Sequence, residues 1–248
     1  MTRNIALVHF NTPEMTEACI LSIRKHGGED YKVFVFDNSD ARPFTKKMKG
    51  VRVFNNRQGQ IIDFKAELAK FPNKSEEAGC AKGCWFGSDV HMMSVQKLWE
   101  LVPEGFVLLD SDVLLKRNIE FMFLPDYCSY GYISISSGYR HQPRLVPMVL
   151  WINVPMCVAG GARFYDPDRS WALHDYYSEK NWWDTGAAFL DDIKRLKPQC
   201  KGRALSKSEI DSTIAHFGGG SWRQNDIETQ QRWLKEHEDL WKPNDIQS

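Results

Sequence analysis

The chain has 248 residues, which suits one large domain or two small ones. Its 32 Lys and Arg residues balance its 32 Asp and Glu residues, and a chain without a basic excess is not expected to bind nucleic acid. Its 42% hydrophobic and 26% charged residues predict a folded protein, and no apolar stretch approaches the roughly 18 residues of a transmembrane segment. The first residues lack a secretory signal, so a cytoplasmic location is expected, either free or at the inner membrane face.

The first half of the chain alternates strand-like and helix-like segments. Apolar runs of strand length cover residues 4–10, 32–36, 51–54 and 106–109. Helical patterns cover residues 13–25, 60–71 and 88–101. The first helix is expected to have Thr12 as its N-cap and to stop at Gly27. Strands that alternate with helices predict an α/β fold, a mostly parallel central sheet flanked by helices.

The second half of the chain is less regular. Strands are expected at 132–136 and 147–154, a helix at 185–196 and an amphipathic terminal helix at 226–241. That terminal helix could pack on the core, on a second subunit or against a membrane surface. No linker separates two domains, so residues 1–248 are expected to form a single domain.

Six cysteines are present, and in a chain of this length without an export signal they are expected to be reduced. Cys80 and Cys84 lie close in sequence. No nearby Cys or His pair completes four zinc ligands, so a structural zinc site is not expected.

The strongest chemical signal is FVLLDSDV at residues 106–113. It delivers two carboxylates, Asp110 and Asp112, from the end of a buried strand. Ligands of α/β sheets bind at the carboxyl ends of strands, where polar residues at 9–12 and 37–38 are also expected. Mg²⁺ or Mn²⁺ takes oxygen ligands and bridges carboxylates to phosphates, so a metal site is predicted. The alternative is an acidic turn that binds nothing.

Several segments together resemble the family 2-like glycosyltransferases of the GT-A fold. The first are IALVHFNTPE (5–14) and VFVFDNS (33–39), which resemble the start of these enzymes. The DSD of residues 110–112 looks like their DxD motif. HFGGGSW (216–222) is similar to their histidine-plus-glycines segment. The resemblance covers about residues 4–40, 86–115 and 150–222 in the right order. It implies a GT-A domain with a nucleotide-binding half at about 1–115, an acceptor half at about 116–225 and a C-terminal helix from 226.

The resemblance implies residues for the nucleotide. Asn11, Thr12 and Pro13, after the first strand, would contact the base. Asp37 would hydrogen-bond the base or the ribose, although an ordinary Asx turn is the alternative. Arg57 would contact the nucleotide from the loop after the third strand, and a solvated loop arginine is its alternative.

The resemblance also implies residues for the metal and the diphosphate. Asp110 would face the ribose or the metal, and Asp112 would be a metal ligand. His216 would be a further ligand of the metal or the diphosphate, with a satisfied structural histidine as the alternative. His91 would help to hold the diphosphate near the N-terminus of the expected helix at 88–101, or would have no such role.

The catalytic base is harder to place. Family members carry an acidic pair before a helix, and here Trp183 stands where the first acid would be. Asp184 is the expected general base of an inverting transfer. Trp182 and Trp183 are expected on the acceptor side, and Gly160 and Gly161 would leave room for a sugar or form a tight turn.

The expected function is a hexosyltransferase-type transfer from a UDP- or GDP-sugar to a carbohydrate or lipid-linked acceptor hydroxyl, with Mn²⁺ or Mg²⁺, in polysaccharide biosynthesis. Two alternatives stay open. A sugar nucleotidyltransferase would need a glycine-rich, basic loop after the first strand, where this chain has Asn11 to Glu14. A non-catalytic carbohydrate or nucleotide-sugar binding protein could share the fold, but it would not need Asp110, Asp112 and His216.

Overall fold

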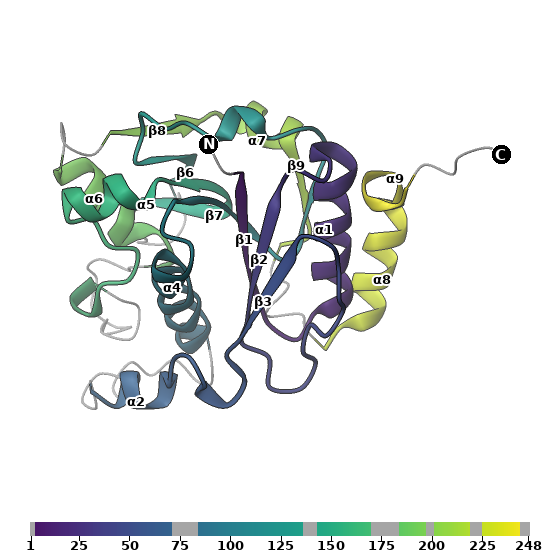
Figure 1. Cartoon of the computed structure of the whole chain (residues 1–248), viewed down its shortest axis with the longest axis horizontal. Helices are drawn as coiled ribbons and strands as arrows, with labels where there is room; N and C mark the ends of the chain where they lie inside the picture. The colour runs from purple at the N-terminus through teal and green to yellow at the C-terminus, as the bar shows by residue number, and fades with distance from the viewer. Residues whose placement is uncertain are drawn as a thin grey trace.

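The computed structural model describes residues 3–70, 84–135, 143–169, 184–196, 201–218 and 225–243. In these residues a seven-stranded sheet has the order β3-β2-β1-β4-β7-β6-β8, and β5 pairs with β9 in a small second sheet (Figure 1). The strands are β1 (Asn4–His9), β2 (Lys32–Asp37), β3 (Val51–Asn55), β4 (Phe106–Asp110), β5 (Val113–Leu115), β6 (Ser129–Ser134), β7 (Arg144–Ile152), β8 (Gly202–Leu205) and β9 (Ile214–His216). The strands β1 to β4 pair in parallel, and β7 is antiparallel to β4 and β6. The predicted α/β fold with a mostly parallel sheet is confirmed.

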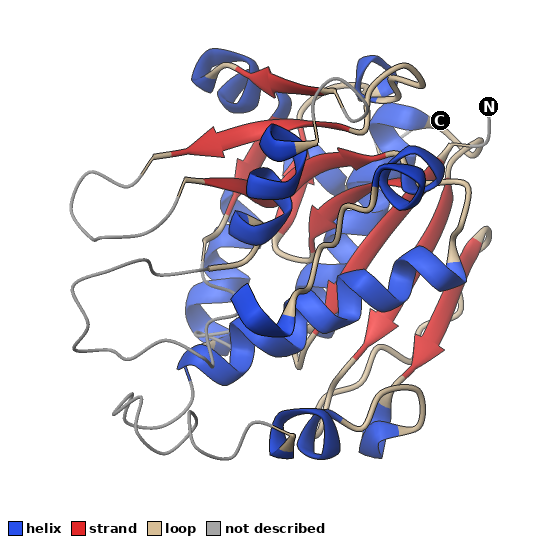
Figure 2. Cartoon of the chain, turned by 90° about the vertical axis from the view of Figure 1, so that its left-hand side faces the viewer, coloured by secondary structure: helices blue, strands red, loops and turns tan. Residues whose placement is uncertain are grey.

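Helices cover both faces of the central strands. The α-helices of the described residues are α1 (Pro13–Gly27), α2 (Phe64–Ala69), α4 (Cys84–Leu101), α5 (Val154–Gly160), α6 (Ala187–Arg195), α7 (Lys207–Thr213), α8 (Ile227–Glu236) and α9 (Glu238–Trp241). Figure 1 shows α4 on one side of the sheet and α1, with α8 and α9 beyond it, on the other. Figure 2 shows the strands side by side behind the helices of the α4 side. None of the described helices has both the length and the apolar character that crossing a bilayer requires.

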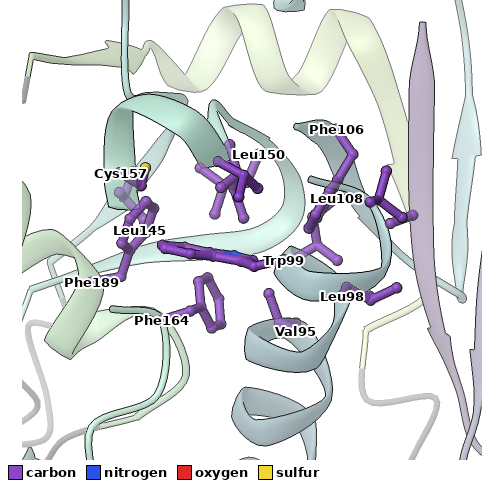
Figure 3. Close-up of a cluster of buried hydrophobic side chains, with 14 of the residues drawn as sticks. Val95, Leu98, Trp99, Phe106, Leu108, Leu145, Leu150, Cys157, Phe164 and Phe189 are labelled. Carbon is purple, nitrogen blue, oxygen red and sulfur yellow. The ribbon is translucent and has the colours of Figure 1, made fainter. Parts of the chain in front are cut away.

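The central strands are apolar throughout because helices bury both of their faces. In β1, Ala6 and Val8 belong to the hydrophobic cluster on the α4 side, and Ile5 and Leu7 belong to the cluster on the α1 side. Trp99 of α4 lies within the first cluster, among aliphatic and aromatic side chains (Figure 3). Its ring contacts Phe189 of α6 edge to face, with 5.7 Å between centroids.

Two predicted helices differ from the structure for local reasons. The helix expected at 60–71 is shorter, because the Asn56 side-chain oxygen accepts the backbone N–H groups of Ile61 and Ile62 and holds that segment in a turn before α2. The terminal helix expected at 226–241 breaks at His237, whose Nδ1 lies 2.9 Å from the carbonyl oxygen of Trp233, the residue one helical turn earlier.

The C-terminal helices pack on the core, which was one of the three expected outcomes. Leu234 of α8 lies in a hydrophobic cluster with Met15 and Ala18 of α1. The Lys25 ammonium at the end of α1 donates hydrogen bonds to the carbonyl oxygens of Asp239 and Lys242. These contacts hold the C-terminal helices against α1.

The cysteines correct one expectation. Cys19 and Cys157 are buried free thiols, but Cys128 is disulfide-bonded, to a partner outside the described side chains. The expectation of reduced cysteines rested on the compartment inferred from the N-terminus and not on the distance between thiols. Cys80 lies outside the described residues.

We expect Gly186→Ala to lower the free energy of unfolding by at least about 2 kcal/mol, measured by denaturant titration. Gly186 precedes α6 with φ of +84°, and an added Cβ would lie 1.9 Å from the carbonyl oxygen of Leu145. Gly161 is a matched control, because its φ is +75° but no atom lies within 4 Å of its added Cβ. Gly161→Ala should therefore cost only the backbone strain, about 1 kcal/mol. Equal losses in the two variants would show that the contact with Leu145 relaxes at no cost.

Candidate active site at the carboxyl edge of the sheet

Strands β4, β5 and β9 bring three ligand-type side chains together at the carboxyl edge of the central strands. The buried strand β4 ends at Asp110, and the chain reaches Asp112 just before β5 begins. Strand β9 pairs antiparallel with β5, so that His216 lies opposite Val113. The backbone N–H of Phe217 also donates to the carbonyl oxygen of Asp112 over 3.1 Å. The small second sheet thus delivers a distant histidine to the two carboxylates.

The geometry of Asp110, Asp112 and His216 suits a metal ion. The Nε2 of His216 lies 3.3 Å from Oδ1 of Asp112 and 3.9 Å from Oδ2 of Asp110. One ligand atom from each residue lies within 4.8 Å of the other two. The side chain of Asp112 is only 8% exposed, whereas those of Asp110 and His216 are 23% and 30% exposed, so the group is open on one side.

The charges of this group favour a cation. Burial and the neighbouring Asp112 carboxylate raise the pKa of Asp110 to about 7. Burial lowers the pKa of His216, but the hydrogen bond to Asp112 and the charges of both carboxylates outweigh it and raise that pKa above its usual value. A divalent cation between these groups would relieve the repulsion between the carboxylates. Two carboxylates and one imidazole are a donor set that Mn²⁺ or Mg²⁺ accepts, with phosphate oxygens as further ligands.

His91 of α4 lies next to Asp110. The Nε2 of His91 lies 3.8 Å from Oδ1 of Asp110. Burial lowers the pKa of His91 to about 4 although Asp184 and Asp112 oppose the shift, so its ring is neutral at pH 7 and can donate one N–H. The structure therefore brings His91 to the predicted metal group.

Asp184 lies near enough for its charge to raise the pKa values of both His91 and Asp110, and three donors hold its carboxylate. Arg144, the first residue of β7, forms an ion pair with Oδ2 of Asp184. The Ser88 hydroxyl and the Thr185 backbone N–H donate to its Oδ1 over 3.0 and 2.7 Å. Sequence reasoning missed Arg144, because a single arginine at the start of a strand carries no spacing signal.

The predicted nucleotide residues Asn11 and Asp37 are buried at the ends of β1 and β2, where their side chains bond the backbone. The side-chain oxygen of Asn11, a residue with φ of +56°, accepts the N–H groups of residues 41 and 42. Asp37 accepts the N–H groups of Ser39 and Phe44 over 2.9 and 3.0 Å. Both side chains therefore shape the loops at this edge, as the Asx-turn alternative for Asp37 implied.

The other predicted residues lie at several places. Thr12 and Pro13 begin α1, with Thr12 at the N-cap but without a side-chain capping bond. Arg57 follows β3, the outermost strand of the sheet. It lies at the carboxyl edge of the strands, as Asp110 does. Gly160 and Gly161 end α5, which follows β7 at the opposite edge, where Ile152 pairs with the start of β4. They are not brought to the candidate site.

Trp182 and Trp183 lie outside the described residues, as do residues 219–224 of the glycine-containing segment. Their expected roles stay predictions.

His216→Ala should weaken Mn²⁺-dependent nucleotide diphosphate binding by about tenfold or more while the chain stays folded. The variant removes one of three ligands, and the side chain is partly exposed, so little packing is lost. Isothermal titration with and without Mn²⁺ measures the effect. His26→Ala, in the last turn of α1 and outside the triad, is the control and should keep wild-type affinity. Unchanged metal dependence in the His216 variant would return this residue to a structural role.

Comparison with known proteins bears on the fold. No family model and no curated protein matches the chain. The galactosyltransferase LgtC, in complex with donor and acceptor sugar analogs, superposes with a TM-score of 0.53 at 12% identity over 98% of each chain. An active-site mutant of LgtC gives 0.51 at 12% identity, over 91% of this chain and 95% of that one. Mouse xyloside xylosyltransferase 1 gives 0.46 at 13% identity, over 90% and 92%. The chain therefore has the GT-A fold of glycosyltransferases, as its sequence motifs implied.

Proposed function

We propose that the protein is a metal-dependent glycosyltransferase that moves a sugar from a nucleotide-sugar donor to an acceptor hydroxyl. The observation that carries the proposal is the group of Asp110, Asp112 and His216 at the carboxyl edge of a GT-A sheet. In open α/β sheets, ligands bind at this edge. Two carboxylates and an imidazole can hold a divalent cation whose further ligands are the diphosphate oxygens.

The residues of the chain fit this chemistry. Asp110, Asp112 and His216 would hold a Mn²⁺ or Mg²⁺ ion, which when bound supplies positive charge to the departing diphosphate. The neutral ring of His91, beside Asp110, can donate an N–H to a phosphate oxygen. Asn11 and Asp37 keep the loops after β1 and β2 in place for a nucleotide, through their bonds to the backbone.

Asp184 is proposed to take the proton of the acceptor hydroxyl. Its carboxylate is 18% exposed, close to the metal group, and held in one orientation by Ser88, Thr185 and Arg144. A carboxylate fixed in one orientation can accept the proton of a hydroxyl bound beside it. The inverting course of the reaction stays a prediction, which NMR of the product's anomeric configuration tests.

The two alternatives differ in what they require. A sugar nucleotidyltransferase needs backbone N–H groups and a lysine after β1, where the structure places the buried side chain of Asn11 and the first turn of α1. A non-catalytic binding protein does not need metal ligands. The hexosyl class of the sugar, the cytoplasmic location, a lipid-linked acceptor and a role in polysaccharide biosynthesis stay predictions.

A thermal-shift screen tests the proposal. UDP- and GDP-sugars, each with and without Mn²⁺, are added to the full chain. A donor present at 100 times its Kd should stabilise the protein by about 2.7 kcal/mol, and only when metal is present. Slow metal-dependent release of the nucleotide from the same donor would then separate an enzyme from a binding protein. No metal-dependent stabilisation by any nucleotide sugar would overturn the proposal.

A further inference from the structure

A cavity of about 420 Å³ opens beside His216. Tyr132 of β6 and Met148 of β7 line one wall, and α7, β9 and α8 line the others. His216 itself is part of the cavity lining. One end of the cavity therefore meets the metal group. Its volume lies in the range of about 300 to 1,000 Å³ that is typical of small-molecule sites.

The described lining of the cavity carries an excess of positive charge. Lys116 and Lys207 line it together with one acidic residue, Asp211. The Lys116 ammonium donates to the backbone carbonyl of Asp211 over 2.8 Å, and Lys207 lies 3.6 Å from the Asp211 carboxylate. The lysine side chains are on the surface, with Lys207 77% exposed, so their ammonium groups can turn toward a bound anion.

The lysines and the metal group lie at opposite ends of the cavity. The backbone N–H of Lys116 donates to the carbonyl oxygen of Thr213, the last residue of α7 and the one before β9. From Thr213 to His216 the chain advances three residues of extended strand, about 10 Å. A sugar with one charged substituent can reach from one end to the other. Tyr132 and Trp233 also line the cavity and add aromatic surface to it.

We infer that this cavity binds the acceptor, and that the acceptor is an anionic sugar whose phosphate or carboxylate contacts Lys116 and Lys207. Its reactive hydroxyl then points toward Asp110, Asp112 and His216. This inference rests on the proposed function for the transfer step, but the binding of an anionic sugar by the two lysines is independent of it.

Binding of a panel of sugars tests the inference. Hexose phosphates, uronic acids and the matching neutral hexoses are added to the full chain and followed by ligand-observed NMR, in the presence of Mn²⁺ and a nucleotide diphosphate. The variant is Lys116→Gln combined with Lys207→Glu. Glutamate in the first turn of α7 is favoured by the helix dipole, so this variant should stay folded. The control is Lys32→Gln combined with Lys47→Gln, two exposed lysines outside the cavity lining.

Charged sugars should bind at least about tenfold more tightly than their neutral counterparts, and the cavity variant should remove that advantage. The control should keep it. Preference for phosphates or for uronic acids identifies the charged group. Equal binding of charged and neutral sugars, or an unchanged preference in the cavity variant, would overturn the inference. Metal-dependent nucleotide binding should be the same in all three proteins, and its absence from the wild type would count against the proposed function alone.

Discussion

Asp112→Asn is expected to abolish the metal-dependent binding of nucleotide diphosphates and to lower sugar transfer by about 10³-fold or more, because charge stabilisation by a bound metal is worth several kcal/mol. Asp112 is the least exposed of the three ligand-type residues, and its Oδ1 lies 3.3 Å from the Nε2 of His216. The amide keeps the shape of the side chain but removes the negative charge. Isothermal titration with and without Mn²⁺, together with initial rates, measures both effects.

The control for this variant is Asp126→Asn, an exposed aspartate in the loop after the 3₁₀ turn Glu120–Met122. It changes the net charge by the same amount and should leave both measurements at the wild-type value. Melting temperatures of the two variants without metal should lie close together, which would exclude unfolding as the cause. Persistent metal dependence in Asp112→Asn would remove the Asp-x-Asp segment from the proposed site.

The parts of the fold that could be predicted from the sequence are those with a strong local pattern. The apolar runs that became β1, β2 and β4 are buried on both faces, and their polar ends, Asp37 and Asp110, were recognisable because the apolar pattern stops there. Since parallel strands end at one edge, the position of the metal group followed from the topology. The motif around His216 added the third ligand through the resemblance.

The rest depends on contacts between distant segments. Strand β9 has three residues, too few to show the alternation of polar and apolar residues by which a strand is recognised. It forms because its backbone pairs with β5. Arg144 becomes part of the site only because β7 starts beside Asp184. The buried bonds of Asn11 and Asp37 to loop N–H groups could not be separated from ligand contacts in the sequence, since both use the same polar atoms.

Asp184→Asn is expected to lower transfer by about 10²- to 10⁴-fold, the usual contribution of a general base. Asparagine keeps the size of the side chain and can still accept from Ser88, but it cannot take a proton from the acceptor hydroxyl. Donor binding and its metal dependence should survive, because Asp184 is not among the predicted metal ligands. Initial rates at saturating donor, and titration of the donor alone, separate the two effects.

The ion pair with Arg144 makes a second variant necessary. Arg144→Gln removes the partner of Asp184 but leaves the carboxylate, so transfer should fall by no more than about tenfold. If Asp184 is the base, the double variant is as inactive as Asp184→Asn. A different result is an equal loss of activity in Asp184→Asn, in Arg144→Gln and in the double variant. It would mean that Asp184 acts only through its ion pair, by positioning the start of β7 beside the metal group. That result would remove it from the chemical step and leave the proton of the acceptor to another group.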